Sequence, residues 1–68
     1  MKKTMLMLEC WMDENRRYIC IRDYSAKCNE YKIFYCWKDN TGKTHKSKIE
    51  EFADFESVLR WFIDNKPN

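Results

Sequence analysis

Three segments of the chain alternate between two kinds of side chain in the way that is typical of β-strands with one covered face. They are rich in β-branched and aromatic residues and run from Thr4 to Met12, from Tyr18 to Tyr24 and from Tyr31 to Lys38. Successive side chains of a strand point to opposite faces of the sheet. Each segment therefore predicts a strand that presents one set of residues to a core and the other set to its opposite face.

The connections between these segments have the composition of hairpin turns. The four residues 39–42 read Asp-Asn-Thr-Gly, in which Asp starts a type I turn and Gly42 stands where a left-handed residue is needed. A short polar run at residues 13–16 predicts an earlier hairpin. Thr44 to Ile49 then returns as a fourth strand, and Lys46 and Lys48 on it are residues that discourage pairing at an exposed sheet edge.

The last part of the chain changes to a helical period. Its apolar residues fall on one stripe of a helix, with charged residues opposite. Asp54 is placed to cap the N-terminus of this helix, and Pro67 ends any continuation. The stripe consists of Phe55, Val58, Leu59, Phe62 and Ile63. The sequence therefore predicts an α+β fold, a four-stranded antiparallel sheet followed by one C-terminal amphipathic helix (ββββα).

Length and composition predict one domain that covers residues 1–68. A chain of 68 residues can form one hydrophobic core, and the 44% of hydrophobic residues with one Gly and one Pro is the composition of a folded domain. No segment approaches the roughly 20 apolar residues that span a bilayer. The apolar N-terminus is short and lacks a small-residue cleavage site, so we interpret it as the first strand. We expect a cytoplasmic protein that does not bind membranes.

The cysteines do not indicate a metal site. Their spacings contain no Cys-x-x-Cys pair, and His45 is the only histidine, so zinc binding is not expected. Nothing indicates secretion, and we interpret the thiols as small buried apolar side chains rather than as disulfides. We expect no cofactor. The four cysteines are Cys10, Cys20, Cys28 and Cys36.

The sequence shows no catalytic machinery. A nucleophile–base pair would have to use His45, which lies in a lysine-flanked strand edge, and the single glycine excludes a glycine-rich phosphate loop. The carboxylates are scattered through turns and the helix. We therefore expect a binding protein and not an enzyme.

Aromatic and basic residues interleave along the second and third strands. Stacking of bases on aromatic rings contributes about 1–3 kcal/mol each, and neighbouring basic side chains neutralise phosphates. A sheet face of this kind would bind single-stranded nucleic acid, although the same rings also suit ordinary cross-strand pairs. The candidate residues on this face are Tyr18, Arg22, Tyr24, Lys32, Phe34 and Lys38.

The run Arg17-Tyr18-Ile19-Cys20-Ile21-Arg22-Asp23-Tyr24, followed by a long strand, a turn, a basic strand and a helix, resembles the positive-cofactor-four family of single-stranded-DNA-binding coactivators. The resemblance covers residues 16–64 in the order of elements. It implies four strands and a helix, a homodimer formed through the helix, and DNA held against the sheet. The residues that it places near the nucleic acid are Arg17, Tyr18, Arg22 and Lys32. The chain departs from the family in its lower positive charge, its longer first strand and the absence of a basic tail.

A protein interface is the second prediction, and we place it slightly ahead. Residues 1–48 carry 11 basic and 6 acidic side chains, whereas residues 49–68 carry 2 basic and 5 acidic ones. The formal net charge of +2 is modest for a nucleic-acid-binding protein. Tryptophans outside the apolar stripes are candidate binding anchors. The predicted function is that of a small protein-binding module or inhibitor of the phage type, which acts on a host or defence protein such as a nucleic-acid enzyme. Its candidate residues are Trp11, Glu50, Glu51, Asp54, Glu56 and Trp61.

Overall fold

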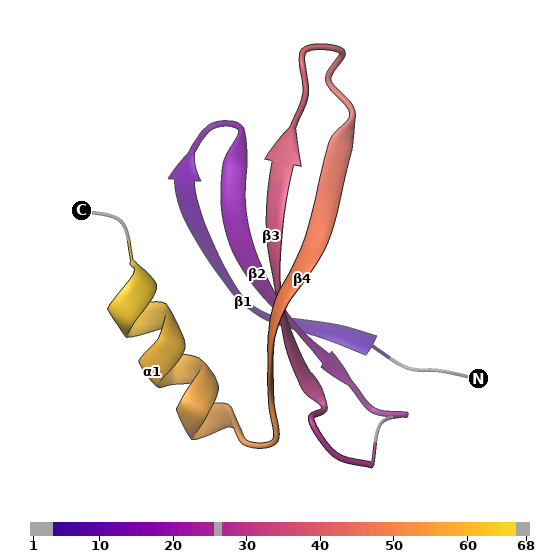
Figure 1. Ribbon diagram of the computed structural model, residues 1–68, viewed down its shortest axis with the longest axis vertical. Coiled ribbons are helices and arrows are strands. Elements are labelled where there is room, and N and C mark those ends of the chain that lie inside the picture. The colour runs from indigo at the N-terminus through magenta and orange to yellow at the C-terminus, as the bar shows by residue number, and fades with distance from the viewer. Residues whose placement is uncertain (1–3, 26, 67–68) are drawn as a thin grey trace.

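A single sheet and one helix make up the part of the chain that the computed structural model describes, residues 4–25 and 27–66 (Figure 1). The elements follow the order β1 (Thr4–Asp13), β2 (Arg16–Asp23), β3 (Tyr31–Lys38), β4 (Thr44–Phe52) and α1 (Phe55–Asn65). The strands lie in the sheet in their chain order, and each pairs antiparallel with the next. The prediction of a four-stranded antiparallel sheet followed by one helix is confirmed.

The largest difference from the predicted boundaries is at the end of β4. This strand continues through Phe52 because Phe52 lies opposite Tyr31 and packs against the core. Two acidic residues, Glu50 and Glu51, precede Phe52, so the alternation of apolar residues does not indicate that the strand continues to this point. At the other end of the helix, Pro67 lies outside the described residues.

The two hairpins are held by aspartate side chains in their turns. In the β3–β4 turn, the Asp39 carboxylate accepts hydrogen bonds from the backbone N–H groups of Thr41 and Lys43 at 2.9 and 3.0 Å. Gly42 has a φ of +86°, so the predicted left-handed position is confirmed. In the β1–β2 turn, the Asp13 carboxylate accepts from the backbone N–H of Asn15 at 2.8 Å.

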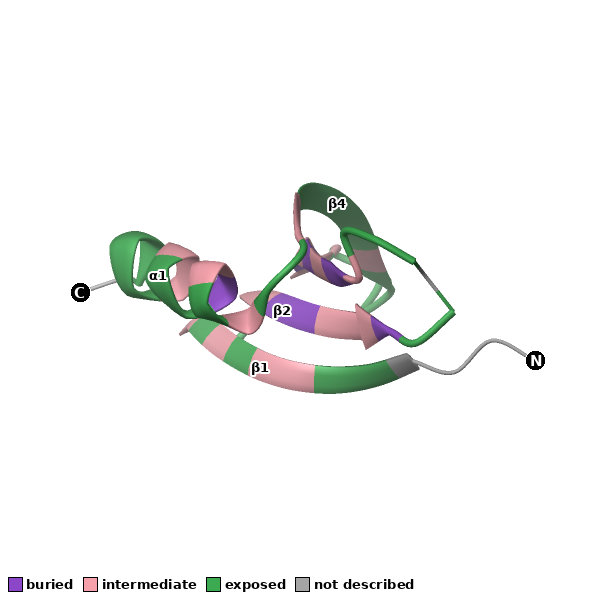
Figure 2. Cartoon of the chain, turned by 90° about the horizontal axis from the view of Figure 1, so that it is seen from below, coloured by how far each residue is buried: buried purple, intermediate pink, exposed green. Residues whose placement is uncertain are grey.

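The core lies between α1 and one face of the sheet. Its buried members are Cys20 on β2, Tyr31 and Ile33 on β3 and Val58 on α1. Cys20 is the register partner of Ile33, so the two side chains point to the same face and meet the helix there. Figure 2 shows the buried parts of the helix and of the central strands turned toward one another. Partly buried residues complete this core: Met7, Leu8, Phe52, Phe55, Trp61 and Phe62.

The helix is rotated relative to the predicted stripe. Trp61 packs against the core, whereas Ile63 is 73% exposed and Leu59 is also exposed. Phe55, Val58, Trp61 and Phe62 form a stripe of their own at helical spacing, and this stripe places the large indole ring on the sheet. The prediction that Ile63 faces the core, with Trp61 outside it, is wrong for this reason.

The N-terminus of α1 is formed differently from the predicted cap. Asp54 occupies the N-cap position with an extended backbone, but its carboxylate makes no capping bond to a backbone N–H group. It accepts a hydrogen bond from the Ser57 hydroxyl at 2.7 Å instead. The side-chain bond thus joins the same two positions that a backbone cap would join.

The two edges of the sheet differ in chemistry. On the β1 edge, Met5, Leu6 and Trp11 are half exposed, and the charged residues of this strand are Glu9 and Asp13. The β1 strand is also irregular, with shifts in register between Leu6 and Leu8 and between Trp11 and Asp13. The β4 edge instead carries the exposed residues Lys46 and Lys48, as the sequence predicts.

The cysteines occupy two kinds of environment. Cys20 and Cys36 are buried, and burial raises the pKa of the Cys20 thiol to about 11. Cys28, however, is exposed in the loop between β2 and β3, and Cys10 is partly exposed. The interpretation of all four thiols as buried apolar groups is therefore wrong for Cys28, because it falls in a connection and not in a strand. All four thiols are free.

None of the helices in residues 4–25 and 27–66 has the length and apolar character required to cross a membrane.

Candidate binding groove

The helix covers only part of its sheet face, and a row of ring side chains occupies the remainder. The row starts on the helix at Trp61, whose ring meets Tyr18 edge-on at a centroid distance of 4.9 Å. The ring centroids of Tyr18 and Tyr35 are 5.8 Å apart, and Tyr35 is stacked on Trp37 with their ring centroids 5.4 Å apart. Trp37 in turn is stacked on His45 at 5.4 Å. The rings therefore form one continuous series from α1 across β2 and β3 to β4.

Strand register places these rings together. Tyr18 is the partner of Tyr35 across β2 and β3, and Trp37 is the partner of His45 across β3 and β4. Tyr35 and Trp37 are two residues apart on one strand and so share a face. The same face carries the core residue Ile33 one step further along β3. The ring row is thus a direct continuation of the core beyond the end of the helix.

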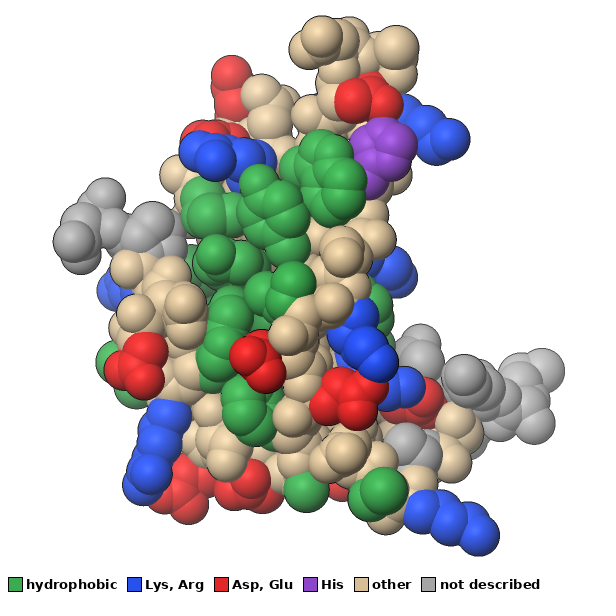
Figure 3. Space-filling view, in the orientation of Figure 1, with side chains coloured by type: hydrophobic (Ala, Val, Ile, Leu, Met, Phe, Trp, Pro, Cys, Tyr) green, Lys and Arg blue, Asp and Glu red, His purple; other side chains and the backbone are tan. Residues whose placement is uncertain are grey.

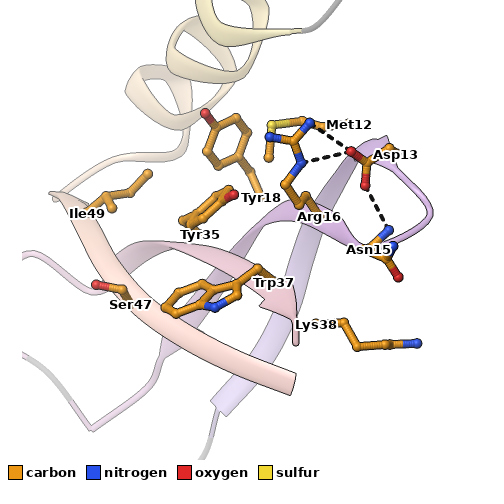
Figure 4. Close-up of a pocket in the computed structure, with 10 residues that line it drawn as sticks. All are labelled: Met12, Asp13, Asn15, Arg16, Tyr18, Tyr35, Trp37, Lys38, Ser47 and Ile49. Atoms are coloured by element: carbon orange, nitrogen blue, oxygen red, sulfur yellow. Dashed lines mark hydrogen bonds and ion pairs between the residues drawn. The ribbon is translucent and has the colours of Figure 1, made fainter. Parts of the chain in front are cut away.

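A groove with a volume of about 960 Å³ lies over this row. Figure 4 shows Tyr18, Tyr35 and Trp37 as its floor, with Ile49 and Ser47 of β4 along one side and the β1–β2 turn along the other. In Figure 3 a band of hydrophobic side chains runs over this part of the surface, bordered by charged groups. The complete lining consists of Met12, Asp13, Asn15, Arg16, Tyr18, Tyr35, Trp37, Lys38, Ser47 and Ile49.

The β1–β2 side of the groove carries one ion pair, formed by Asp13 and Arg16. Arg16 pairs with Asp13 at 2.8 Å, and hydrogen bonds to Asp13 and then to Tyr35 raise the pKa of the Arg16 guanidinium. The hydrogen bond from the Asn15 backbone, followed by that from the Arg16 side chain, lowers the pKa of Asp13. The Lys38 side chain makes no ion pair within the described part of the chain. Lys38 adjoins the groove at the end of β3, but it is the register partner of Thr44, so its side chain belongs to the face opposite the ring row, and in Figure 4 it points away from the rings.

The far end of the ring row is fixed by the β3–β4 turn. The Nε2 atom of His45 lies 2.7 Å from an Asp39 carboxylate oxygen. Hydrogen bonds from the Thr41 hydroxyl, from His45 and from the turn backbone hold the pKa of Asp39 well below its usual range. A single ionised carboxylate therefore organises the turn and also orients the imidazole that stacks on Trp37.

The residues predicted to bind nucleic acid do not lie on one face. Tyr18 and Arg22 share the helix-bearing face, because they are the register partners of Tyr35 and Tyr31. Lys32 and Phe34 are the partners of Ile21 and Ile19 and lie on the opposite face. The remaining residues of the predicted set divide in the same way: Tyr24 follows β2, while Arg17 and Lys38 belong to the face opposite the helix. A single basic aromatic face is therefore an incorrect prediction.

Several of these basic residues are also paired within the chain. Arg17 lies 3.3 Å from Glu9, Arg22 lies 3.4 Å from Glu30, and Lys32 lies 3.2 Å from Asp23. The first two contacts are long, and the Nε atoms of both arginines have no hydrogen-bond partner among the described residues.

Three exposed or partly exposed rings are covered by cations of this chain. The guanidinium of Arg17 lies over Trp11, and that of Arg22 lies over Tyr24. The ammonium of Lys46 lies over Phe34 at 4.7 Å. These cation–π contacts occupy ring faces on which a base would have to stack.

The residues predicted to bind a protein partner are separated too. Trp11 is 52% exposed, on the face opposite the helix. Trp61 is instead partly buried against Tyr18 and Phe62, so it is a structural residue at the end of the ring row and not an exposed anchor.

The acidic members of this set lie at the β4–α1 corner. Glu51 forms an ion pair with Lys48, and Glu56 forms one with Arg60. Glu50 and Asp54 are exposed.

Sequence reasoning missed the central groove residues Tyr35 and Trp37. The predicted nucleic-acid face takes the Phe34 side of this strand, which leaves Tyr35 and Trp37 on the core side together with Ile33. A usable signal was present in the element lengths. A helix of 11 residues spans roughly 16 Å and a strand of 8 residues roughly 26 Å. A single helix of this length leaves part of the strand face uncovered.

Other features of the surface are weaker candidates for a binding site. A smaller apolar groove of about 220 Å³ lies between β1 and α1 and includes the exposed residues Leu59 and Ile63. The association of two chains through this side of the helix stays a prediction. In residues 4–25 and 27–66, no three histidine, cysteine or carboxylate side chains gather as a metal site would require.

The chain was compared with protein-family models, with curated proteins and with solved structures, and none of the three comparisons gave a match.

Proposed function

We propose that this chain is a non-catalytic protein-binding module and that the aromatic groove on its helix-bearing face is the binding surface. The observation that carries the proposal is the continuous row of rings from Tyr18 to His45, whose first three members form the floor of the groove. Aromatic side chains are enriched at the centres of protein interfaces because they bury a large area with few rotatable bonds.

The shape of the groove favours a polypeptide segment over a compact small molecule. Its volume of about 960 Å³ lies at the upper end of the range of small-molecule pockets, roughly 300–1,000 Å³, yet it is an open surface feature and not an enclosed cavity. Its centre is formed by Tyr35 and Trp37, and polar residues of the lining such as Asp13, Arg16 and Ser47 lie around them, so it has the apolar centre and polar rim of an interface.

The charge of the groove also favours a protein over a nucleic acid. Binding to phosphates gains most of its affinity from unpaired lysines and arginines. Here Arg16 is paired with Asp13, and the side chain of Lys38, the other basic residue of the lining, belongs to the sheet face opposite the rings. The neighbouring rings Tyr35, Trp37 and His45 lie in contact with one another, which leaves no space for a base between them.

The test is a selection of short random peptides displayed on yeast, with the full chain as bait. Peptides are first enriched on the unaltered protein and then depleted on the Trp37→Ala variant. We expect a pool whose binding is lost in Trp37→Ala and retained in Trp11→Ala, a matched control because Trp11 is an exposed tryptophan on the other face of the sheet.

Two outcomes would contradict the proposal. One is a pool that binds Trp37→Ala and the unaltered protein equally well. The other is tight, salt-dependent binding of labelled single-stranded oligonucleotides that Trp37→Ala abolishes, because this result would assign the groove to nucleic acid. Circular dichroism of each variant establishes that it is folded.

A further inference from the structure

We propose that β1 is a second interaction surface whose partner is a second copy of this chain. The β1 strands of the two copies pair antiparallel, and Cys10 of one copy lies opposite Cys10 of the other. This inference goes beyond the proposed function and does not depend on it. It rests on three features of the β1 side of the molecule: an open strand edge, the exposed apolar residues beside it and the order of the charges along the strand.

The outer edge of β1 has no strand beside it in the described part of the chain. β1 is the first strand in the sheet order, and β2 pairs with its inner side. Figure 2 shows β1 along the lower border of the chain, with α1 above one end of it. Edge strands of monomers are commonly short or carry lysine or proline, but β1 spans 10 residues and contains neither. Its outward backbone groups are therefore available to another strand.

The large apolar side chains that the fold leaves exposed gather on this side of the molecule. Of the seven such side chains in residues 4–25 and 27–66, only Ile49 lies elsewhere, on β4. Tyr24 belongs to the group because its hydroxyl donates a hydrogen bond to the Sδ atom of Met5 at 3.8 Å. A concentration of exposed apolar residues of this kind marks an interaction surface. The six residues are Met5, Leu6 and Trp11 of β1, Tyr24 after β2, and Leu59 and Ile63 of α1.

These residues flank the open edge on both faces of the sheet. Leu6 and Trp11 are the register partners of Ile21 and Arg17, and they lie on the face opposite the helix. On the helix-bearing face, Leu59 and Ile63 line the small apolar groove between β1 and α1. Antiparallel pairing about a two-fold axis normal to the sheet brings the same two sets from the second copy to the same two faces. A second copy thus supplies both the strand and the apolar groups that this edge lacks.

The charges of β1 select one alignment of the two strands. The register shifts of β1 leave a regular run from Leu8 to Trp11, whose interior residues are Glu9 and Cys10. In a symmetric antiparallel pair, one residue lies opposite its own copy at the two-fold axis. Glu9 at the axis would set two carboxylates directly opposite each other, which is destabilising. Cys10 at the axis instead sets Glu9 opposite Trp11 of the second copy.

The same alignment brings a carboxylate toward Arg17. The guanidinium of Arg17 lies over the Trp11 ring, 4.8 Å from its centroid. Its contact with Glu9 of its own chain is long, at 3.3 Å, and its Nε atom has no hydrogen-bond partner among the described residues. Glu9 of the second copy, opposite Trp11, adds a negative charge beside this guanidinium. The alignment centred on Cys10 therefore avoids like charges and also places opposite charges together.

The first experiment is sedimentation equilibrium of the full chain under reducing conditions, over a series of concentrations. We expect a reversible dimer. Trp11→Glu should weaken it at least about tenfold, because it removes the indole and sets like charges opposite each other. The matched control is Ile49→Glu, which places the same charge at the exposed apolar residue of β4 and should leave the dimer unchanged.

A charge exchange tests the alignment. Addition of Glu9→Lys to Trp11→Glu sets opposite charges across the junction again, and should recover about three- to tenfold of the lost affinity. This recovery is specific to the alignment centred on Cys10, because Glu9 lies opposite Trp11 in that alignment. Circular dichroism of each variant establishes that it is folded.

A disulfide test leaves the charges and the indole of β1 unaltered. Directly opposite residues of antiparallel strands have Cα atoms about 4.5–5.5 Å apart, a distance that a disulfide spans. The variant Cys28→Ser removes the exposed thiol of the β2–β3 loop, while Cys20 and Cys36 are buried. Oxidation of this variant with copper phenanthroline in air should link two chains. The further change Cys10→Ser should abolish this product.

Three results would overturn the inference. The first is a monomer at the highest concentration that the protein tolerates. The second is a dimer that Trp11→Glu leaves intact and Ile63→Glu dissociates, because this result would place the junction on the helix. The third is a dimer of the Cys28→Ser variant that oxidation does not link through Cys10. None of these results bears on the proposed function, because the peptide selection depends on Trp37 of β3.

Discussion

The helix-bearing face of the sheet has two halves that differ in how they are covered. In one half, Cys20 and Ile33 are fully buried beneath Val58 of α1. In the other half, Tyr35 and Trp37 extend the same strand face but keep contact with solvent. The two halves belong to the same strands and to the same register, so the end of the helix alone separates them. A core and a binding surface can thus be two stretches of one pleated face.

The chemistry of the side chains follows this division. The covered half uses aliphatic groups and thiols, which have no strong donor to satisfy when they are buried. The open half uses tyrosine and tryptophan, whose rings pack while their polar atoms remain available. Tyr31 is an exception, since it is buried in the covered half beside Phe55 and beneath the Arg22 guanidinium.

The largest expected difference between the two halves is in the cost of truncating one side chain on β3. Ile33→Ala should lower the free energy of unfolding by about 2–5 kcal/mol, close to the whole stability of about 3–5 kcal/mol that a core of this size supplies. Tyr35→Ala, two residues further along the same face, should cost only about 1–2 kcal/mol, from its ring contacts. Urea denaturation followed by circular dichroism measures both. Equal costs would show that the open half is part of the core.

The boundary between the halves is tested at Trp61. Trp61→Ala should lower the free energy of unfolding by about 2 kcal/mol, less than the 3–5 kcal/mol of a buried tryptophan because its ring is partly exposed. The matched change on the same helix, Ile63→Ala, should cost less than about 0.5 kcal/mol because Ile63 is largely exposed. Thermal melts of both variants measure the difference. A larger effect at Ile63 would contradict the rotation of the helix.

A smaller effect is expected at the turn that supports the open half. Gly42→Ala should cost about 1–2 kcal/mol, since φ is +86° there and left-handed backbone disfavours residues with a Cβ. Apart from the two neighbouring residues in the chain, no atom of the described residues lies within 4 Å of the added Cβ, so the cost is one of backbone conformation and not of a clash. Gly42→Asn should cost less, because asparagine tolerates this region. Melting temperatures of the two variants provide the comparison, and an equal loss in both would point to a steric cause.

The smallest expected effect is a loss of folding stability at acid pH. Hydrogen bonds from Ser25, followed by that from Lys32, lower the pKa of Asp23 to about 2 from an ordinary value of 3.8. A carboxylate with a depressed pKa contributes stability above its unfolded pKa and loses it as the pH falls through the folded value. Stability should therefore fall between about pH 4 and pH 2. Melting curves of Asp23→Asn across this range should be flatter than those of the unaltered chain, and parallel curves would refute the assignment. The Asp39 carboxylate acts in the same direction at the other end of the sheet, so the Asp39→Asn variant separates the two contributions.

The elements of the fold could be predicted because their signals are local. Alternation identifies each strand without knowledge of its neighbours, and the Asp39–Gly42 turn contains its own conformational requirement. Local alternation does not determine which side chains of β2 and β3 share a face, because this depends on how the two strands pair. A connection between two strands can set either register parity, and a shift of one residue exchanges the faces. The grouping of Tyr18 with Phe34 failed at this step, although each strand had been identified.

The site was harder to predict than the fold. Tyr18 and Lys38 were identified as binding residues, but for a different ligand and on one common face. Tyr35 and Trp37 were assigned to the core because apolar alternation does not report where a covering helix ends. The position of Trp61 has the same origin, since neighbouring stripes of the helix were both apolar and contacts with Tyr18 decided between them.

The unequal edges of the sheet limit the stoichiometry of any assembly formed by strand pairing. Continuous ribbons require two pairable edges per chain, one for each neighbour. Here the β4 edge is protected by Lys46 and Lys48, whereas the β1 edge exposes Met5, Leu6 and Trp11. Pairing of two chains through β1 would cover the only unprotected edge among the described strands of each chain. The assembly would therefore stop at a symmetric dimer. In such a pair both grooves would remain open, because their floor lies on the face of the sheet and not at the β1 edge.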